Sequence, residues 1–394
     1  MSDPAATIAS PAARQLSPDM PGKGRSVQIF QPRNLASWVF LWGLAFGAVA
    51  AFRWFQPVSI AVGTATMWAS VLFFLYLLPW LWFLRHKDRR TPIPAKVLIV
   101  GFLWGGLTAA FLIALPGNDS LMSIYGKAVS PEFAHDWGAA LAAPFTEETG
   151  KGLGILLLMF IAPRIIRLPF DGFIVGAFVG LGFQIFEDVL YAANEAISGF
   201  GADQVHAVMQ TLMLRGATGI FSHALYSAVY GAGLVYLIGT AVIPVHRIRG
   251  IGYILAAMLM HGAWDAGSAI AGEIGVAPLA VMAGIGLIEL VVILLIGRRV
   301  SRGERAWLRE ILTPEVDRGT ITQAELDALV GSGRERRRFI RSAHGYRDRR
   351  MARHVLEAAS DLAEALGASD GHDSPEARFA RSEVERVRCG AAAG

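Results

Sequence analysis

The sequence is short of two things that most soluble proteins have, cysteine and charge. Its 394 residues include one Cys, at position 389, which excludes a disulfide framework and a zinc site built on thiolates. Only 17% of the residues are charged, against about 25% in ordinary soluble domains, while 54% are hydrophobic. Residues 1–34 are rich in Pro, Ala and Ser and lack an apolar core of signal-peptide length, so we expect a disordered cytoplasmic segment there. These shortages argue against a soluble globular enzyme.

In place of charge, the sequence has eight apolar stretches of about 20 residues or more, the length that crosses a bilayer as a helix. Because lipid offers no hydrogen-bond partner to an open strand edge, we predict an all-α polytopic bundle of about eight transmembrane helices within 35–297. The predicted spans are 35–55, 57–84, 96–116, 136–163, 170–194, 215–243, 249–271 and 276–297.

Positive charge alternates between the connecting loops. Lys and Arg are concentrated after the second, fourth, sixth and eighth spans, for example in 85–90 and at Arg298 and Arg299, and they are scarce in the other loops. The positive-inside rule then places both termini in the cytoplasm. The net charge of +4 follows from these loops, so it does not indicate a nucleic-acid partner.

The composition changes to a soluble, Arg-rich one in 298–394. Thr322 and Glu325 have the spacing of a capping box, which predicts a helix start. We therefore expect a small helical cytoplasmic tail. The Arg cluster in 334–341 is a candidate contact for anionic lipid or a cytoplasmic partner, and a solvated helix face explains it equally well.

Several ionisable side chains lie inside the predicted spans, where a charge costs about 2.5–3.5 kcal/mol at the bilayer centre. Unpaired, they would oppose insertion strongly, so they are expected to face the bundle interior and to satisfy one another. They are Glu147, Glu148 and Lys151 in the fourth span, Glu187 in the fifth, His223 in the sixth, and His261 and Asp265 in the seventh.

Spacing and depth both favour one shared site. Lys151 follows the two adjacent glutamates at i+4 and i+3, so it can neutralise either one on the same helix face. Asp265 follows His261 at i+4, where a carboxylate can orient an imidazole. With a rise of about 1.5 Å per residue, the four spans bring these groups to the midplane or between it and the outer face. A candidate active site on four helices follows.

The order of these residues resembles that of the PrsW family of intramembrane proteases, which is related to the CAAX-processing and bacteriocin-processing membrane proteases. The resemblance covers about 135–270 and rests on Glu147-Glu148-x-x-Lys151, Phe183-x-x-x-Glu187, a histidine in the next span (His223), and His261-x-x-x-Asp265. It implies hydrolysis of a peptide bond in a single-span membrane substrate, such as an anti-sigma factor, near the outer face of a bacterial plasma membrane.

Two mechanisms fit these residues. In the first, Glu147 or Glu148 is the general base that deprotonates water, and Glu187, His223 and His261 position the water and stabilise the oxyanion. In the second, Glu187, His223 and His261 bind Zn²⁺ and a glutamate of the pair is the base. Lys151, Asp265 and Phe183 have supporting roles in both, and no His-Glu-x-x-His motif is present.

Two other functions use similar residues. A proton-coupled carrier also needs buried Glu, His and Asp side chains, but the two halves of the chain show no inverted repeat. A non-catalytic scaffold or signalling protein of the same fold is the other alternative.

Overall fold

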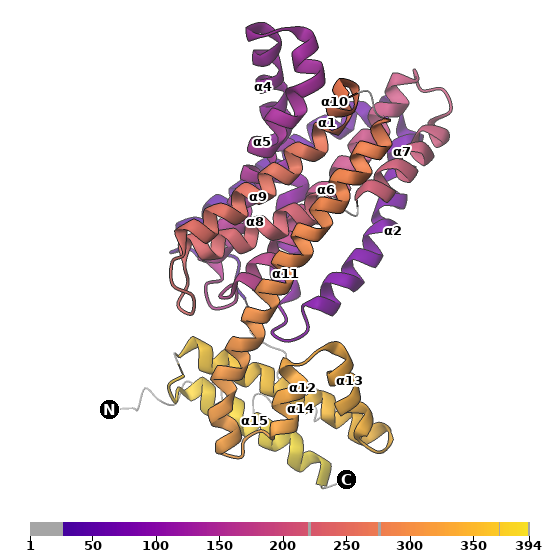
Figure 1. Ribbon diagram of the computed structural model, residues 1–394. Helices are drawn as coiled ribbons and strands as arrows, with labels where there is room; N and C mark the ends of the chain where they lie inside the picture. Colours follow the sequence, from indigo (N-terminus) through magenta and orange to yellow (C-terminus); the bar gives the residue numbers. More distant parts are fainter. Residues whose placement is uncertain (1–26, 220–221, 275–276, 370, 393–394) are drawn as a thin grey trace. The chain divides into compact units, whose positions relative to one another are not determined.

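The computed structural model describes residues 27–219, 222–274, 277–369 and 371–392, and every regular element in these ranges is a helix. The chain divides into two compact units, Val27–Gly303 and a second that begins at Glu304 (Figure 1). The predicted all-α fold is confirmed. The larger unit contains all the ionisable residues assigned to the candidate site.

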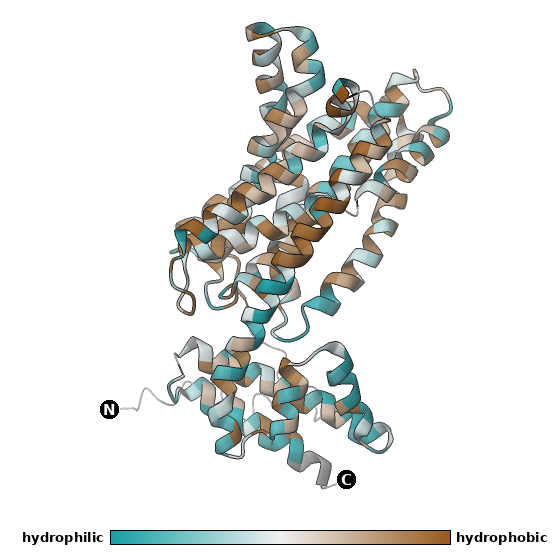
Figure 2. Cartoon of the chain, in the orientation of Figure 1, coloured by the Kyte–Doolittle hydropathy of each residue, from teal (hydrophilic) through white to brown (hydrophobic). Residues whose placement is uncertain are grey.

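Six helical stretches of the described chain are long and apolar enough to cross a membrane. A seventh span is formed if α9 (Arg247–Asp265) and α10 (Gly267–Ile274), which are bent by 56° to one another, cross as one. Figure 2 shows apolar residues along the membrane-length part of α11, where a bilayer would contact it. The six stretches are α1 (Leu35–Ala61), α2 (Gly63–Lys87), Ala95–Ala128, α6 (Pro169–Ser198), Gln204–Ile238 and α11 (Pro278–Asp317).

Length and composition thus support six or seven spans, against the eight predicted, and the difference is α5 (Pro131–Ile161). This helix is 31 residues long, but its buried middle carries Glu147, Glu148 and Lys151. With three charged residues within two turns, α5 has more charge than an ordinary transmembrane helix. The helix that departs from the usual composition is therefore the one that carries the candidate site.

Helix α6 lies at the centre of the larger unit and is buried along most of its length. Its glycines let the backbone of α8 (His223–Ile238) approach closely, as in other small-residue helix contacts. A Cβ atom added at Gly176 would lie 2.0 Å from the carbonyl oxygen of Ser227, and one at Gly180 would lie 2.2 Å from that of His223. This close contact fixes where His223 lies relative to α6.

The third predicted span is longer than expected. Helix α3 (Ala95–Leu103), the π-helix η3 (Trp104–Ala114) and α4 (Leu115–Ala128) follow one another without a break. The prediction, made from length and hydropathy, ended this span at 116. Pro116 lies in the first turn of α4, directly after η3. Figure 1 shows α4 and the first turns of α5 extending together beyond the neighbouring helices.

The second unit is helical, and the capping box at its first short helix is present, with Thr322 and Glu325 exchanging hydrogen bonds. The predicted boundary at 298 falls inside α11, which continues to Asp317. Residues 1–26 of the N-terminal segment and the side chain of Cys389 lie outside the described residues. The unit contains the end of α11 with α12 (Gln323–Val330), α13 (Gly333–Ser342), α14 (Gly345–Ala368) and α15 (Pro375–Ala392).

Candidate active site

Helix α5 carries three charged side chains within about one turn, and all are buried. The exposed fraction is 4% for Glu147 and 0% for Glu148 and Lys151. Nζ of Lys151 lies 2.6 Å from Oε1 of Glu148 and 3.6 Å from Oε2 of Glu147, as the i, i+3 and i, i+4 spacings predict. One ammonium group therefore faces two carboxylates.

Glu148 is fully engaged by its neighbours. Besides the ion pair with Lys151, it accepts a hydrogen bond from Oγ of Ser227 on α8 at 3.1 Å. Its Oε1 also lies 3.0 Å from Nδ1 of His261 on α9. A carboxylate held by three groups in this way is suited to positioning its partners.

Glu147 is held through only one of its two oxygens. Its Oε1 accepts a hydrogen bond from Nδ2 of Asn118 on α4 at 3.0 Å. Its Oε2 is buried and has no hydrogen-bond partner within the described part of the chain. A buried carboxylate oxygen without a partner is costly, so such an atom in a native site calls for a water, an ion or a substrate group.

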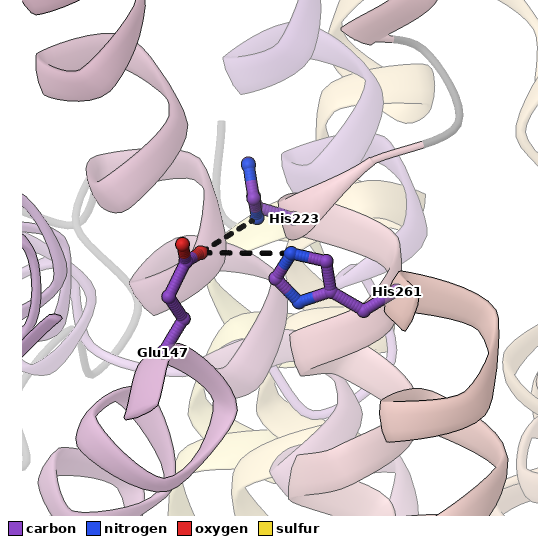
Figure 3. Close-up of side chains that lie close together, drawn as sticks. All are labelled: Glu147, His223 and His261. Atoms are coloured by element: carbon purple, nitrogen blue, oxygen red, sulfur yellow. Dashed lines mark ion pairs between the residues drawn. The ribbon is translucent and has the colours of Figure 1, made fainter. Parts of the chain in front are cut away.

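The two histidines turn one ring nitrogen each toward this oxygen (Figure 3). Nδ1 of His223 lies 3.7 Å and Nε2 of His261 lies 3.6 Å from Oε2 of Glu147. The opposite nitrogens contact carboxylates, Nε2 of His223 with Glu187 at 2.9 Å and Nδ1 of His261 with Glu148 at 3.0 Å. Because an ionised carboxylate only accepts hydrogen bonds, these opposite nitrogens carry the protons. The nitrogens that face Glu147 then present lone pairs, and that of His223 is engaged by the ammonium group of Lys151 at 3.1 Å.

These three side chains are the group of described residues best placed to hold a metal ion. One donor atom each from Glu147, His223 and His261 lies within 4.8 Å of the others, and all three residues are buried. The sequence-based ligand set had Glu187 in place of Glu147. The structure differs because Glu187 contacts the far nitrogen of His223, on the side away from the other two donors.

Lys151 and Phe183 enclose His223. Nζ of Lys151 lies 3.1 Å from Nδ1 of His223 and 4.2 Å from the centroid of the Phe183 ring. The same ring lies 5.0 Å from the imidazole, centroid to centroid. Lys151 has three N–H donors, so it can serve Glu148 and His223 together. Metal binding through Nδ1 of His223 would require Lys151 to release that nitrogen.

The carboxylates at the end of this cluster share one arginine, which the sequence analysis did not assign to the site. Arg215, on α7 (Gln204–Thr218), pairs with Glu187 at 2.5 Å and also with Asp188. The signal for Arg215 was present, because it is the one Lys or Arg residue between Arg167 and Arg247. A cluster rich in carboxylates requires such a cation.

His223 is not inside a continuous helix, as the predicted span 215–243 required. Helix α7 ends at Thr218, and α8 begins at His223 with Ser222 as its N-cap. Gln184 on α6 donates a hydrogen bond to the carbonyl oxygen of Gly219 and accepts one from Oγ of Ser222. Such side-chain bonds allow irregular backbone at membrane depth, provided that it is buried in protein.

Asp265 lies one turn after His261, as predicted, with Oδ2 3.4 Å from Nε2 of the ring. Gly262, the residue after His261, is important for packing. A Cβ atom at Gly262 would lie 3.0 Å from the carbonyl oxygen of Ala140, so the glycine lets α9 approach α5. Asp265 ends α9 at the bend toward α10, and its side chain is 23% exposed.

Glu289, a charged residue on the apolar part of α11, is connected to His261 through Tyr226. The hydroxyl of Tyr226 donates a hydrogen bond to Oε2 of Glu289 at 2.8 Å. The Tyr226 ring stacks on the imidazole of His261, with centroids 5.5 Å apart and an interplanar angle of 24°. Glu289 therefore helps to fix a ring that covers one face of His261.

The charge of the cluster favours a bound cation. It contains five carboxylates and two cations, Lys151 and Arg215, and a buried excess of negative charge is unstable without compensation. The carboxylates are Glu147, Glu148, Glu187, Asp188 and Asp265. Two histidines and one glutamate are also a ligand set that zinc accepts. The residues thus fit a divalent metal ion.

The fold and the site define a multi-pass helical membrane protein with a buried carboxylate–histidine centre, an arrangement that suits an intramembrane hydrolase and is also used in proton relays. The model of the PrsW family of intramembrane metalloproteases matches residues 93–296, about half of the chain, and the protein belongs to this family. The resemblance seen in the sequence is thereby confirmed. The match also extends beyond 135–270 to include Asn118 and Glu289, which the structure connects to the site.

No curated protein and no solved structure matches the chain. The family membership makes the protein an intramembrane peptidase rather than a carrier.

Proposed function

We propose that this peptidase cleaves a single-span, membrane-anchored protein with a water that is activated at Glu147. The observation that carries the proposal is the buried Oε2 of Glu147, which lacks a hydrogen-bond partner among the described residues and faces one nitrogen of each histidine. This oxygen and the two ring nitrogens form a centre that can hold a water next to a scissile carbonyl group.

The neighbouring carboxylates prepare the histidines for this task. Glu187 accepts a hydrogen bond from the proton-bearing nitrogen of His223. Glu148 accepts a hydrogen bond from the proton-bearing nitrogen of His261. Each contact fixes one tautomer and the orientation of one ring, as carboxylate–histidine pairs do around metals. In this proposal Glu148 and Glu187 are positioning residues. Lys151 offsets the charge of Glu148, and Arg215 offsets that of Glu187.

The family is described as one of metalloproteases, and we propose that Glu147, His223 and His261 hold a zinc ion. A bound zinc ion would lower the pKa of a coordinated water to about 7 and polarise the scissile carbonyl group. Zinc would also compensate the excess of carboxylates around Lys151 and Arg215.

The glutamate mechanism uses the same residues without an ion. Glu147 accepts one proton of the attacking water. A histidine stabilises the oxyanion that develops on the substrate only through an N–H group, so in this mechanism His223 or His261 is the imidazolium, with protons on both ring nitrogens. The unpartnered Oε2 of Glu147 favours this mechanism as well, so metal content and chelation are needed to separate the two.

The family resemblance suggests the class of substrate. We propose a membrane-anchored regulatory protein, with an anti-sigma factor as the specific candidate, cleaved near the outer face of the plasma membrane. The positive-inside pattern of the loops supports this side, because it places the polar residues of the four spans at the midplane or toward the outer leaflet.

The test is cleavage of a candidate single-span substrate by the full-length protein in liposomes. Wild type is compared with Glu147→Gln, which keeps the shape of the side chain and removes its basicity. Glu195→Gln is the matched control, because Glu195 is an exposed residue of the same class on α6. We expect cleavage by the control at the wild-type rate and a loss of about 10²–10⁴-fold for Glu147→Gln.

A second arm adds a membrane-permeable chelator and then restores zinc. Loss and recovery of cleavage support the zinc mechanism, whereas full activity of a preparation without measurable metal supports the glutamate mechanism. Undiminished cleavage by the purified Glu147→Gln variant would refute both.

A further inference from the structure

A cavity of about 470 Å³ lies between α9 and α11, away from the candidate active site. Four arginines line it, Arg249 near the start of α9 and Arg298, Arg299 and Arg302 on α11. All belong to the unit Val27–Gly303. Two helices that are distant in sequence thus bring four guanidinium groups to one opening.

The positive charge of this cavity is not compensated by the protein. None of the four arginines forms an ion pair with a carboxylate in the part of the chain that the structure describes. Arg249 instead lies over the ring of Tyr236, with its guanidinium carbon 5.0 Å from the centroid. Four unpaired guanidinium groups side by side repel one another, so their convergence favours an anionic ligand.

The cavity also offers a neutral hydrogen-bonding group. Tyr253, one turn after Arg249 on α9, lines the cavity. Its hydroxyl group is buried and has no hydrogen-bond partner among the described residues. A buried hydroxyl group without a partner costs free energy, and a ligand oxygen would satisfy it. This is the second observation, independent of charge, that points to a ligand.

The remaining lining is apolar and lies on the membrane side of the arginines. Leu295 and Ile296 come just before Arg298 in α11, where its apolar span ends. The side chain of Leu295 is 58% exposed. An anion held by the arginines would therefore lie at the level of the lipid headgroups, with an aliphatic surface next to it on the bilayer side. Free phosphate would leave that surface in water, whereas a phospholipid would cover it.

We propose that this cavity binds the headgroup of an anionic phospholipid. The phosphodiester accepts hydrogen bonds from the arginines and from the Tyr253 hydroxyl group, and the first carbons of an acyl chain contact Leu295 and Ile296. The bound lipid would link α9, which carries His261, to α11, which carries Glu289. General attraction of basic loops to the membrane surface requires neither a cavity nor a buried hydroxyl group, which distinguishes the two explanations.

The experiment uses the full-length protein in neutral detergent, with phosphatidylglycerol added against phosphatidylcholine as the uncharged comparison. Retained lipid is counted by native mass spectrometry, and the unfolding midpoint is followed with increasing lipid. Arg249→Gln/Arg299→Gln is the test variant. Arg247→Gln/Lys96→Gln is the matched control, because it removes the same charge from exposed positions outside the cavity. Tyr253→Phe removes only the hydroxyl group.

Wild type is expected to retain phosphatidylglycerol and to be stabilised by it, and phosphatidylcholine to have little effect. The test variant should bind about 100-fold more weakly, since each charge-assisted hydrogen bond to the phosphodiester contributes about tenfold. The control should change binding much less, because its two residues lie outside the cavity, and Tyr253→Phe should weaken binding without loss of charge.

Equal losses in the test and control variants would show diffuse attraction and overturn the proposal. Equal stabilisation by inorganic phosphate at the same concentration would identify a soluble anion as the ligand and overturn the lipid assignment. Neither result depends on proteolytic activity.

Discussion

Arg215 and Glu187 form an ion pair that joins α7 to α6, with Nη2 and Oε2 2.5 Å apart. Glu187 in turn contacts Nε2 of His223, so the arginine acts on the active-site histidine through one carboxylate. Through these two contacts, Glu187 connects α6 to both α7 and α8.

We expect Arg215→Met to lower both stability and cleavage rate. Removal of one partner of a buried charge pair typically costs about 3–5 kcal/mol, and less here because the Arg215 side chain is 24% exposed. The released Glu187 would no longer hold His223 in one orientation. The thermal midpoint and the single-turnover cleavage rate in liposomes measure the two effects. Asp188→Asn in the same background should recover stability but not the rate, and recovery of both would assign Arg215 a purely structural role.

Metal content distinguishes the ligand set of the structure from the one that the sequence favoured. We expect wild type to copurify with zinc, and Glu147→Gln, His223→Ala and His261→Ala to lose it. Glu187→Gln should retain zinc with affinity lowered about 10–100-fold, as is usual when a group behind a ligand is changed. Inductively coupled plasma mass spectrometry of the purified variants gives the answer. Full zinc in Glu147→Gln together with none in Glu187→Gln would restore the set Glu187, His223 and His261.

Lys151 is expected to be required for stability as well as for activity. Lys151→Met leaves Glu148 and Glu147 without their shared ammonium group in a fully buried place, which should cost about 3–5 kcal/mol. Neutralising its closer partner as well, in Glu148→Gln/Lys151→Met, should restore most of the stability. Cleavage should stay low in the double variant, because Glu148 also orients His261. Chemical denaturation and the cleavage assay test the two statements separately.

The contact between Gly180 and His223 predicts a strong effect of a small substitution. Gly180→Ala would place a Cβ atom 2.2 Å from the carbonyl oxygen of His223, so α8 must shift. We expect a loss of stability of about 1–3 kcal/mol, typical of overpacking, and a larger relative loss of cleavage. Gly284→Ala on α11 is the control, because nothing lies within 4 Å of its added Cβ atom. Identical thermal midpoints for the two variants would contradict the close packing of α6 and α8.

The site residues that could be predicted from sequence are those that would carry a large free-energy cost in a membrane if they had no function. A charge inside an apolar span is conspicuous, so Glu147, Glu148, Lys151 and Glu187 stand out without any structure. Pairs on one helix, such as Lys151 with Glu148, follow from the 3.6-residue period. These predictions need only local geometry.

Partners on different helices could not be predicted, because they depend on how each helix is rotated about its axis. Asn118 and Tyr226 are ordinary polar and aromatic residues in sequence, and only packing aims them at Glu147 and His261. The helix break before His223 was missed because the flanking residues are apolar enough to continue a span, although Gly216 and Gly219 are both helix-weakening residues there. The structure groups Glu147, rather than Glu187, with the two histidines, and this grouping depends on the same helix rotations.

The π-helix η3 sets the angular phase of the residues that follow it. Each residue of an α-helix turns the chain by about 100°, whereas the wider i→i+5 pairing turns it less. Over the eleven residues Trp104–Ala114 this difference accumulates, and Asn118 comes to face Glu147. Deleting a single residue within η3 would turn the Asn118 amide away from Glu147. The orientation of the Glu147 carboxylate thus depends partly on the winding of a segment without a single charged residue.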